Sequence, residues 1–199
     1  MSTSGILLGH SRDGSPAALR LFRPQPTRVF TCVRDYMKWV LIFRSVALGA
    51  HITLVTTNPR AWTVLVQALQ ACGGTVEVTS DPTAIPGQGR PYRPSLVVDD
   101  SAEADGARMS LGVWQSVLVL EDAASSSAIH AMRACDVTLV SPCDGRVSEN
   151  MKRGLALNSQ LLKQTNNLAE NELIVAMPRR LERITMPPTT IEYQMLFGG

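Results

Sequence analysis

The chain has 199 residues, 45% of them hydrophobic and 18% charged, which suits one domain with a buried core and excludes global disorder. Its net charge of +2 is too small to indicate nucleic-acid binding by itself. The four cysteines have no C-x-x-C spacing, so neither a zinc site nor a redox pair is indicated. No apolar run approaches the roughly 18 residues of a membrane helix, and the N-terminus lacks a signal-peptide pattern. We therefore expect a cytoplasmic protein that binds no cofactor and no metal.

The chain opens with two short apolar runs around Asp13-Gly14, a strong hairpin signal within residues 1–25. A βαβ unit follows. Its parts are a strand at 28–31, a helix at 37–48 and a strand at 52–56. Parallel strands joined in this way imply an α/β layer architecture.

Strands and helices continue to alternate through the rest of the chain. The predicted elements are, in order, a helix from 59 to about 72, strands at 75–78, 96–100 and 113–120, a helix at 125–134, a strand at 136–140, two helices within 146–168 and a hairpin of strands at 173–177 and 181–185. An amphipathic tail covers 186–199. Residues 80–94, rich in proline and glycine, predict a mobile surface loop, and 101–112 predict a second loop.

This pattern predicts a single domain over residues 1–199. We expect a three-layer αβα domain, Rossmann-like or P-loop-like, with a mostly parallel sheet, an N-terminal β-hairpin and a C-terminal strand pair. The residues expected in its core are Val29, Leu41, Val46, Leu54, Leu65, Val97, Leu118, Leu139 and Val175.

The loop inside the βαβ unit places a lysine in the register of a phosphate-binding loop. Such a loop reads G-x-x-x-x-G-K-[ST] between a strand and a helix, and here the eight positions run from Cys32 to Trp39, with Lys38 in the lysine position. Cys32 and Met37 replace the glycines that let backbone N–H groups face phosphate. Trp39 has no oxygen for Mg²⁺, and Asp35 adds a negative charge. A working NTPase site is therefore not expected, and the register of Lys38 is either a vestige or chance.

A second segment has the form of a Walker B strand. The apolar run Leu96-Val97-Val98 ends in Asp99 and Asp100, and an acid in that position can hold Mg²⁺ or orient water. The alternative is structural, because strands commonly end in Asp at turns. The candidate site residues are then Arg34 and Lys38 in a vestigial phosphate loop and Asp99 and Asp100 in a vestigial Walker B segment, with no catalytic residue.

The order of these parts resembles the motor domains of the FtsK/SpoIIIE type, including the tandem ATPase domains of actinobacterial type VII (ESX) secretion. The likeness runs through the segments GILLGHSRDGSPAALRLF, RVFTCVRDYMKWVLIFRSVALGA, LVVDD and NELIVAMPRRLERITMPPTTIE. The segment RSVALGAHITLVTTNPRAW is also similar to small Rossmann-like proteins associated with actinobacterial type VII secretion clusters. Because the phosphate glycines and the Mg²⁺ hydroxyl are replaced, the resemblance implies a pseudo-ATPase that keeps the fold without hydrolysis.

Two functions follow as hypotheses. The first is a non-catalytic interaction module of a type VII-like secretion system, with a secretion ATPase, another component or a substrate as protein partner, any membrane contact through that partner, and a homo-oligomer left open. The second is a nucleotide- or phosphometabolite-binding α/β protein, with or without enzymatic activity, that uses the crevice at the carboxyl ends of the strands. That crevice would lie near Arg34, Thr57, Asp99, Glu121 and Ser141. Nucleic-acid binding is not expected, because no helix carries a concentrated basic face.

Overall fold

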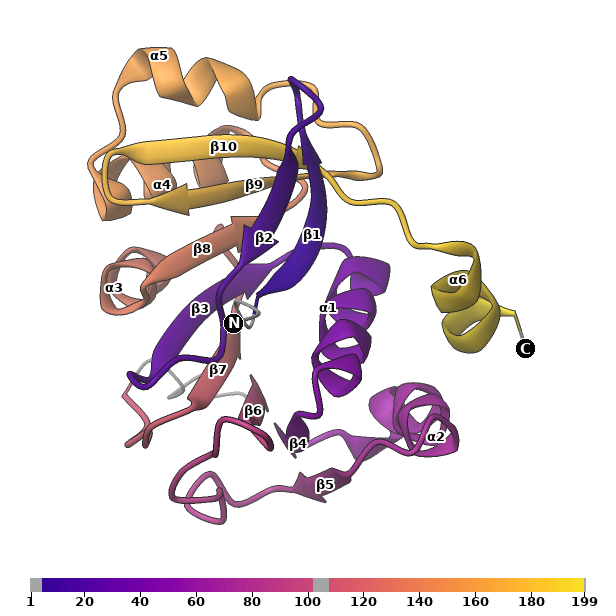
Figure 1. Ribbon diagram of the computed structural model, residues 1–199. Helices are drawn as coiled ribbons and strands as arrows, with labels where there is room; N and C mark the ends of the chain where they lie inside the picture. The colour runs from indigo at the N-terminus through magenta and orange to yellow at the C-terminus, as the bar shows by residue number, and fades with distance from the viewer. Residues whose placement is uncertain (1–4, 102–107, 199) are drawn as a thin grey trace.

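The computed structural model describes residues 5–101 and 108–198, and within them ten strands form one sheet (Figure 1). The strands are β1 (Ile6–Ser11), β2 (Pro16–Leu19), β3 (Thr27–Cys32), β4 (His51–Thr56), β5 (Val76–Thr79), β6 (Ser95–Asp100), β7 (Gln115–Leu120), β8 (Val137–Val140), β9 (Glu172–Met177) and β10 (Arg180–Thr185). Their order across the sheet is β2-β1-β10-β9-β8-β3-β7-β6-β4-β5. The run from β8 to β5 is parallel, whereas β9, β10, β1 and β2 pair antiparallel.

Helices lie on both faces of this sheet, so the domain has three layers (Figure 1). The helical elements are α1 (Asp35–Ala47), η1 (Pro59–Trp62), α2 (Thr63–Ala71), α3 (Ala128–Ala134), α4 (Gly145–Leu155), α5 (Ser159–Leu162), η3 (Lys163–Thr165) and α6 (Thr190–Phe197). Helices α1, α2 and α6 lie on one side, and α3 and α4 lie on the other. The predicted three-layer α/β fold, with an N-terminal hairpin and a C-terminal strand pair, is confirmed.

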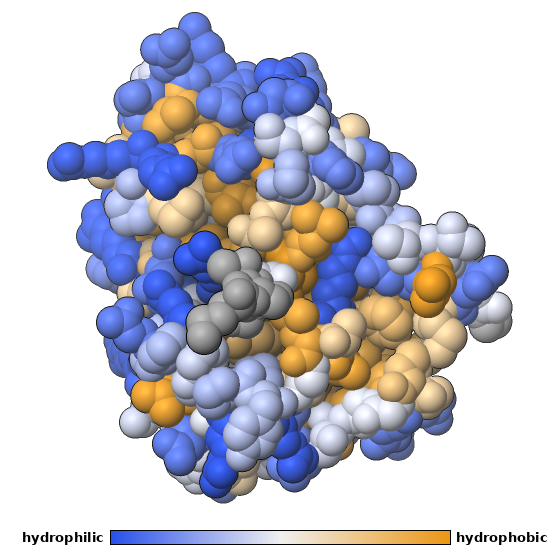
Figure 2. Space-filling model, viewed as in Figure 1, coloured by the Kyte–Doolittle hydropathy of each residue, from blue (hydrophilic) through white to orange (hydrophobic). Residues whose placement is uncertain are grey.

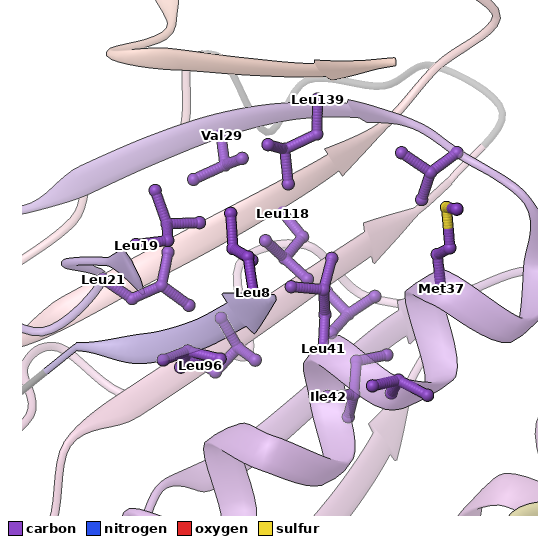
Figure 3. Packing of buried hydrophobic residues seen from close by; sticks show 14 of the residues in the cluster. Leu8, Leu19, Leu21, Val29, Met37, Leu41, Ile42, Leu96, Leu118 and Leu139 are labelled. Atoms are coloured by element: carbon purple, nitrogen blue, oxygen red, sulfur yellow. The ribbon is translucent and has the colours of Figure 1, made fainter. Parts of the chain in front are cut away.

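The alternation of side chains along the strands divides the core between the two faces. Leu54 and Leu118 pack in the cluster beneath α1, and their neighbours Val55 and Val119 pack in the cluster beneath α3 and α4. Both positions of each pair are apolar because parallel strands covered on both faces have no solvent side. Figure 3 shows the first cluster, where side chains from the N-terminal hairpin, α1 and the sheet point toward one another.

Seven of the nine residues expected in the core are buried. The two exceptions, Val46 and Val175, are half-buried and pack at its margin. Val175 is on β9 in the floor of a surface groove described below, where the helices on its face of the sheet do not reach. The sequence pattern of β9 indicates that Val175 faces the core. It does not indicate that the helical layer leaves this part of the sheet uncovered.

Several element boundaries differ from the sequence-based expectation. Helix α1 begins at Asp35 rather than at 37. After β8 the helical region is divided, as expected, where Ala156 adopts a left-handed conformation, with φ of 52°, directly after α4, and it ends at Thr165 rather than at 168. The Asn58 side chain caps no backbone N–H, and the chain enters α2 through the 3₁₀ turn η1 instead. Of the expected loop at 101–112, residues 102–107 lie outside the described residues, as do residues 1–4 of the hairpin and 199 of the tail.

Candidate functional site

The carboxyl ends of the parallel strands bring most of the predicted site residues to one edge of the sheet. Strand β3 leads to Arg34, β6 ends in Asp99 and Asp100, β7 leads to Glu121 and β8 leads to Ser141. These strands lie side by side in the order β8-β3-β7-β6, so β7 separates the lysine-bearing loop from the acidic strand. Crossovers from β3 and β7 lead to opposite faces, which makes their carboxyl ends the switch point of the sheet.

The connection from β3 to α1 is too short to form a phosphate cradle. Strand β3 ends at Cys32 and α1 begins at Asp35, so only Val33 and Arg34 join them. Val33 is buried, and the N–H groups of Met37 and Lys38 both donate to the Arg34 carbonyl, at 3.0 and 3.2 Å. Backbone donors that a P-loop would direct at phosphate are therefore already used inside the helix.

The side chains in the loop register serve the fold. Lys38 Nζ is 2.7 Å from Asp35 Oδ1, one turn earlier on α1, so its charge is already paired. Met37 is fully buried in the core beneath α1. Trp39, in the position of the Mg²⁺-binding hydroxyl, stacks on Phe197 of α6 with ring centroids 5.8 Å apart. Trp39, which stands where a P-loop has its Mg²⁺-binding hydroxyl, therefore packs the C-terminal helix α6 against α1.

The two carboxylates at the end of β6 are held by neighbouring groups. Asp99 is fully buried, and its Oδ1 accepts hydrogen bonds from the Ser101 N–H and hydroxyl, at 3.1 and 2.6 Å. Asp100 Oδ2 accepts from Trp62 Nε1 at 2.6 Å and from Thr56 Oγ1 at 3.0 Å. Asp100 therefore fixes the corner where β4 turns into η1.

Other polar groups at this edge also have partners within the chain, whereas Arg34 Nε is buried without a hydrogen-bond partner in the described structure. Glu121 accepts hydrogen bonds from Ser125 and Ser127, and Ser141 Oγ donates to the Glu172 carbonyl at 2.7 Å. Burial raises the pKa of the Cys32 thiol, whose sulfur accepts the Ala123 N–H at 3.4 Å. This cysteine is therefore a neutral thiol near pH 7 rather than a nucleophilic thiolate.

A groove of about 520 Å³ lies away from this edge, between the N-terminal hairpin and strands β8, β9 and β10. Its apolar floor includes Val137, Val175 and Met177, and its rim includes Arg20 and Arg180. Figure 2 shows apolar residues exposed among hydrophilic ones on this side of the molecule, around the hairpin and the β9–β10 pair. Sequence reasoning does not find this groove, because it is formed by segments more than a hundred residues apart.

The groove is lined by three arginines, Arg20, Arg23 and Arg180, and by two acids, Asp136 and Glu182. Arg23 Nη2 contacts Asp136 Oδ1 at 3.1 Å, and the second oxygen of Asp136 accepts the Arg28 N–H at 2.8 Å. Neither Arg20 nor Arg180 forms an ion pair with any residue in the part of the chain that the structure describes. Both guanidinium groups are therefore available to an external carboxylate.

Solved structures of known proteins share this fold at very low sequence identity. VirB4 of Thermoanaerobacter pseudethanolicus superposes with a TM-score of 0.64 and 8% identity, covering 98% of this chain and 99% of that one. The genome packaging NTPase B204 from Sulfolobus turreted icosahedral virus 2, in complex with AMP, covers 83% of this chain and 100% of its own, with a TM-score of 0.51 and 7% identity. The pCW3 conjugation coupling protein TcpA, with ATPγS, gives 0.50 and 10% over 93% of this chain and 66% of that one.

No protein-family model matches the sequence, and no curated protein matches it. The structural likeness therefore establishes the fold alone: an α/β domain like those of VirB4, the packaging NTPase B204 and the coupling protein TcpA. Among the described residues, no helix has the length and apolar character needed to cross a membrane.

Proposed function

We propose that this chain is a pseudo-ATPase: a non-catalytic module with a P-loop ATPase fold that docks to an ATPase of a type VII-like secretion system. The observation that carries the proposal is the two-residue connection from β3 to α1, followed by a lysine that is already paired with Asp35. The fold remains, while the geometry that would hold phosphate and Mg²⁺ is occupied by contacts within the chain.

The energetics support weak nucleotide binding at most. An exposed ion pair such as one lysine with one phosphate contributes about 1 kcal/mol or less, whereas millimolar binding needs about 4 kcal/mol. Lys38 would also have to leave Asp35 before it could contact phosphate. The glycine-rich backbone cradle that normally supplies the difference is missing from the β3–α1 connection.

Calorimetric titration with Mg-ATP tests the non-catalytic part of the proposal. We expect no binding tighter than about 1 mM and no hydrolysis, in the native chain and in Lys38→Ala alike. Lys152→Ala, which removes an exposed lysine on α4, is the matched control. A micromolar dissociation constant that Lys38→Ala abolishes and Lys152→Ala preserves would refute the pseudo-ATPase and favour the nucleotide-binding alternative at this edge.

The groove beside the N-terminal hairpin is the surface that we propose for docking. Its occupant would be an extended segment of the secretion ATPase that carries carboxylates for Arg20 and Arg180 and apolar side chains for the floor. Charge complementarity of this kind sets the rate and specificity of association. An extended segment suits the site because β2 is the last strand at this edge of the sheet.

Binding to a purified ATPase of a type VII-like secretion system tests the docking role. We expect a complex whose affinity falls at least tenfold in Arg20→Glu and Arg180→Glu, and also in Ala18→Arg, which places a large side chain at the exposed groove wall. Ala84→Arg introduces the same side chain at an exposed position away from the groove and should leave affinity unchanged. Equal affinity in all four variants would exclude the groove, and absence of a complex would exclude this ATPase as partner.

A further inference from the structure

A small hairpin in the loop between β5 and β6 sets two arginines directly opposite each other. Arg90 and Arg93 form an antiparallel bridge in which each N–H donates to the other's carbonyl, at 2.9 and 3.0 Å. Pro91 and Tyr92 make the turn between them. Side chains directly opposite in such a pair have Cβ atoms about 5 Å apart, so the two guanidinium groups start from neighbouring positions.

The hairpin is fixed to the sheet rather than free in solvent. The Gly89 N–H donates to the Val113 carbonyl at 2.8 Å, and Gln115 Nε2 donates to the Pro86 carbonyl at 2.6 Å. Gly89 packs so closely that a Cβ there would lie 2.1 Å from the Trp114 carbonyl oxygen. The two arginines are therefore presented by a rigid backbone, which reduces the entropy lost when a ligand is bound.

Both arginines line a pocket of about 210 Å³ at the amino ends of β4 and β6, together with His51 and Ser95. The Nε2 atom of His51 is 3.5 Å from a Glu77 carboxylate oxygen, whereas its Nδ1 is buried without a hydrogen-bond partner in the described structure. A buried polar atom without a partner is costly and is commonly satisfied by a ligand or water. The volume is below the 300–1,000 Å³ typical of pockets for drug-sized ligands, so it suits a small group.

The charges at this pocket are not balanced within the described residues. Like charges directly opposite each other in a strand pair are destabilising, and neither Arg90 nor Arg93 forms an ion pair there. Arg90 Nη1 donates to the Tyr92 hydroxyl at 3.0 Å, which orients the guanidinium without neutralising it. A bound anion would remove the repulsion, and guanidinium forks match phosphate oxygens in two-point contacts.

We propose that this pocket binds the phosphate group of a phosphate monoester, with Arg90 and Arg93 as the principal contacts and His51 at the base. The site is independent of the proposed pseudo-ATPase function, because it lies at the amino edge of the sheet. The six-residue strands β4 and β6 separate it from the carboxyl edge by about 17 Å.

Inorganic phosphate is the first probe, titrated calorimetrically at constant ionic strength. We expect Arg90→Ala and Arg93→Ala to weaken binding at least tenfold and Arg93→Lys to weaken it as well, because lysine offers no planar fork. Arg146→Ala removes an exposed arginine on α4, outside both proposed sites, and should change the dissociation constant less than twofold. Phosphate also stabilises proteins non-specifically, so a response of equal size in all four variants would overturn the proposal, as would no response at tens of millimolar.

Two further arms distinguish the source of the phosphate group. Glycerol 3-phosphate in solution tests a soluble monoester, and sedimentation with phosphatidylcholine vesicles containing phosphatidic acid tests a lipid headgroup. Binding in either arm that is lost in Arg93→Ala supports phosphate recognition and assigns its source. Binding of inorganic phosphate with loss of both monoester arms would overturn the monoester assignment.

Discussion

At the scale of single residues, Arg44 joins the two ends of the described chain. Its guanidinium makes a two-point contact with Glu192 of α6, at 2.6 and 2.9 Å, and donates to the Leu7 and Leu8 carbonyls of β1. Both charged side chains are largely buried, 15% and 7% exposed. Because one arginine satisfies acceptors from β1 and α6 together, its removal leaves several buried polar groups without partners.

We predict that Arg44→Met lowers the free energy of unfolding by about 3–5 kcal/mol, because Glu192 is left as an uncompensated buried charge. Arg153→Met is the matched control, since Arg153 pairs with Glu149 in an exposed contact at (i, i+4), worth about 0.5 kcal/mol or less. Urea denaturation followed by tryptophan fluorescence measures both. Equal decreases in the free energy of unfolding in the two variants would mean that Arg44 does not hold α6 against the rest of the chain.

A second paired acid, the half-buried Glu172, predicts how stability depends on pH. Hydrogen bonds from Arg183 hold the pKa of Glu172 below its ordinary value of 4.5. A carboxylate with a lowered folded-state pKa contributes stability above its unfolded pKa and loses it as pH falls through the folded value. We therefore expect Glu172→Gln to be less stable than the native chain at pH 7, with the difference shrinking below pH 4.5. A difference that stays constant down to acid unfolding would contradict this linkage.

At the scale of elements, the sequence predicts what is local and misses what depends on distant contacts. The β-branched runs at β3, β4 and β6 and the apolar stripe of α1 are visible without a structure, because burial on both faces demands them. The groove depends on how the hairpin pairs with β10, and the stacking of Trp39 on Phe197 joins α1 to the C-terminal helix α6. No local pattern encodes either contact.

The loop at 80–94 illustrates the same limit. Its proline and glycine content predicts a mobile surface segment. Its second half, however, is hydrogen-bonded to residues 113–115, at the start of β7. One local signal does indicate the arginine hairpin: proline at the second position of R-P-Y-R favours a β-turn that would place the two arginines opposite each other. The pocket that they line with His51 needs the sheet, and so it is not visible in the sequence.

We predict that Gly89→Ala destabilises the protein by about 1–3 kcal/mol, as overpacking does elsewhere, because the new Cβ would meet the Trp114 carbonyl. Gly87→Ala, two residues away, adds a Cβ with no heavy atom within 4 Å and should have little effect. Hydrogen exchange should also show a protected Gly89 amide beside fast exchange near Ala84. If all amides of residues 80–94 exchange fast and neither Gly87→Ala nor Gly89→Ala lowers stability, the segment is mobile, as the sequence predicts.

At the scale of the whole molecule, the two faces of the sheet should unfold together if residues 1–199 form a single domain. Adjacent residues such as Leu54 and Val55 belong to different core clusters, so the central strands, such as β4, are shared by both cores. Neither face can lose its packing without disturbing the strands that support the other. A single cooperative transition is therefore expected, as in most small domains.

Two cavity-forming substitutions on opposite faces test this coupling. Leu41→Ala on α1 and Met151→Ala on α4 each remove a fully or almost fully buried side chain, and each should cost about 2–5 kcal/mol. Leu54→Asp should abolish folding, because an unpaired carboxylate would be buried in a central strand. In denaturant, far-ultraviolet circular dichroism and tryptophan fluorescence should give coincident curves for each cavity variant. Separate transitions, with only one shifted by each substitution, would divide the chain into two units and refute the single domain.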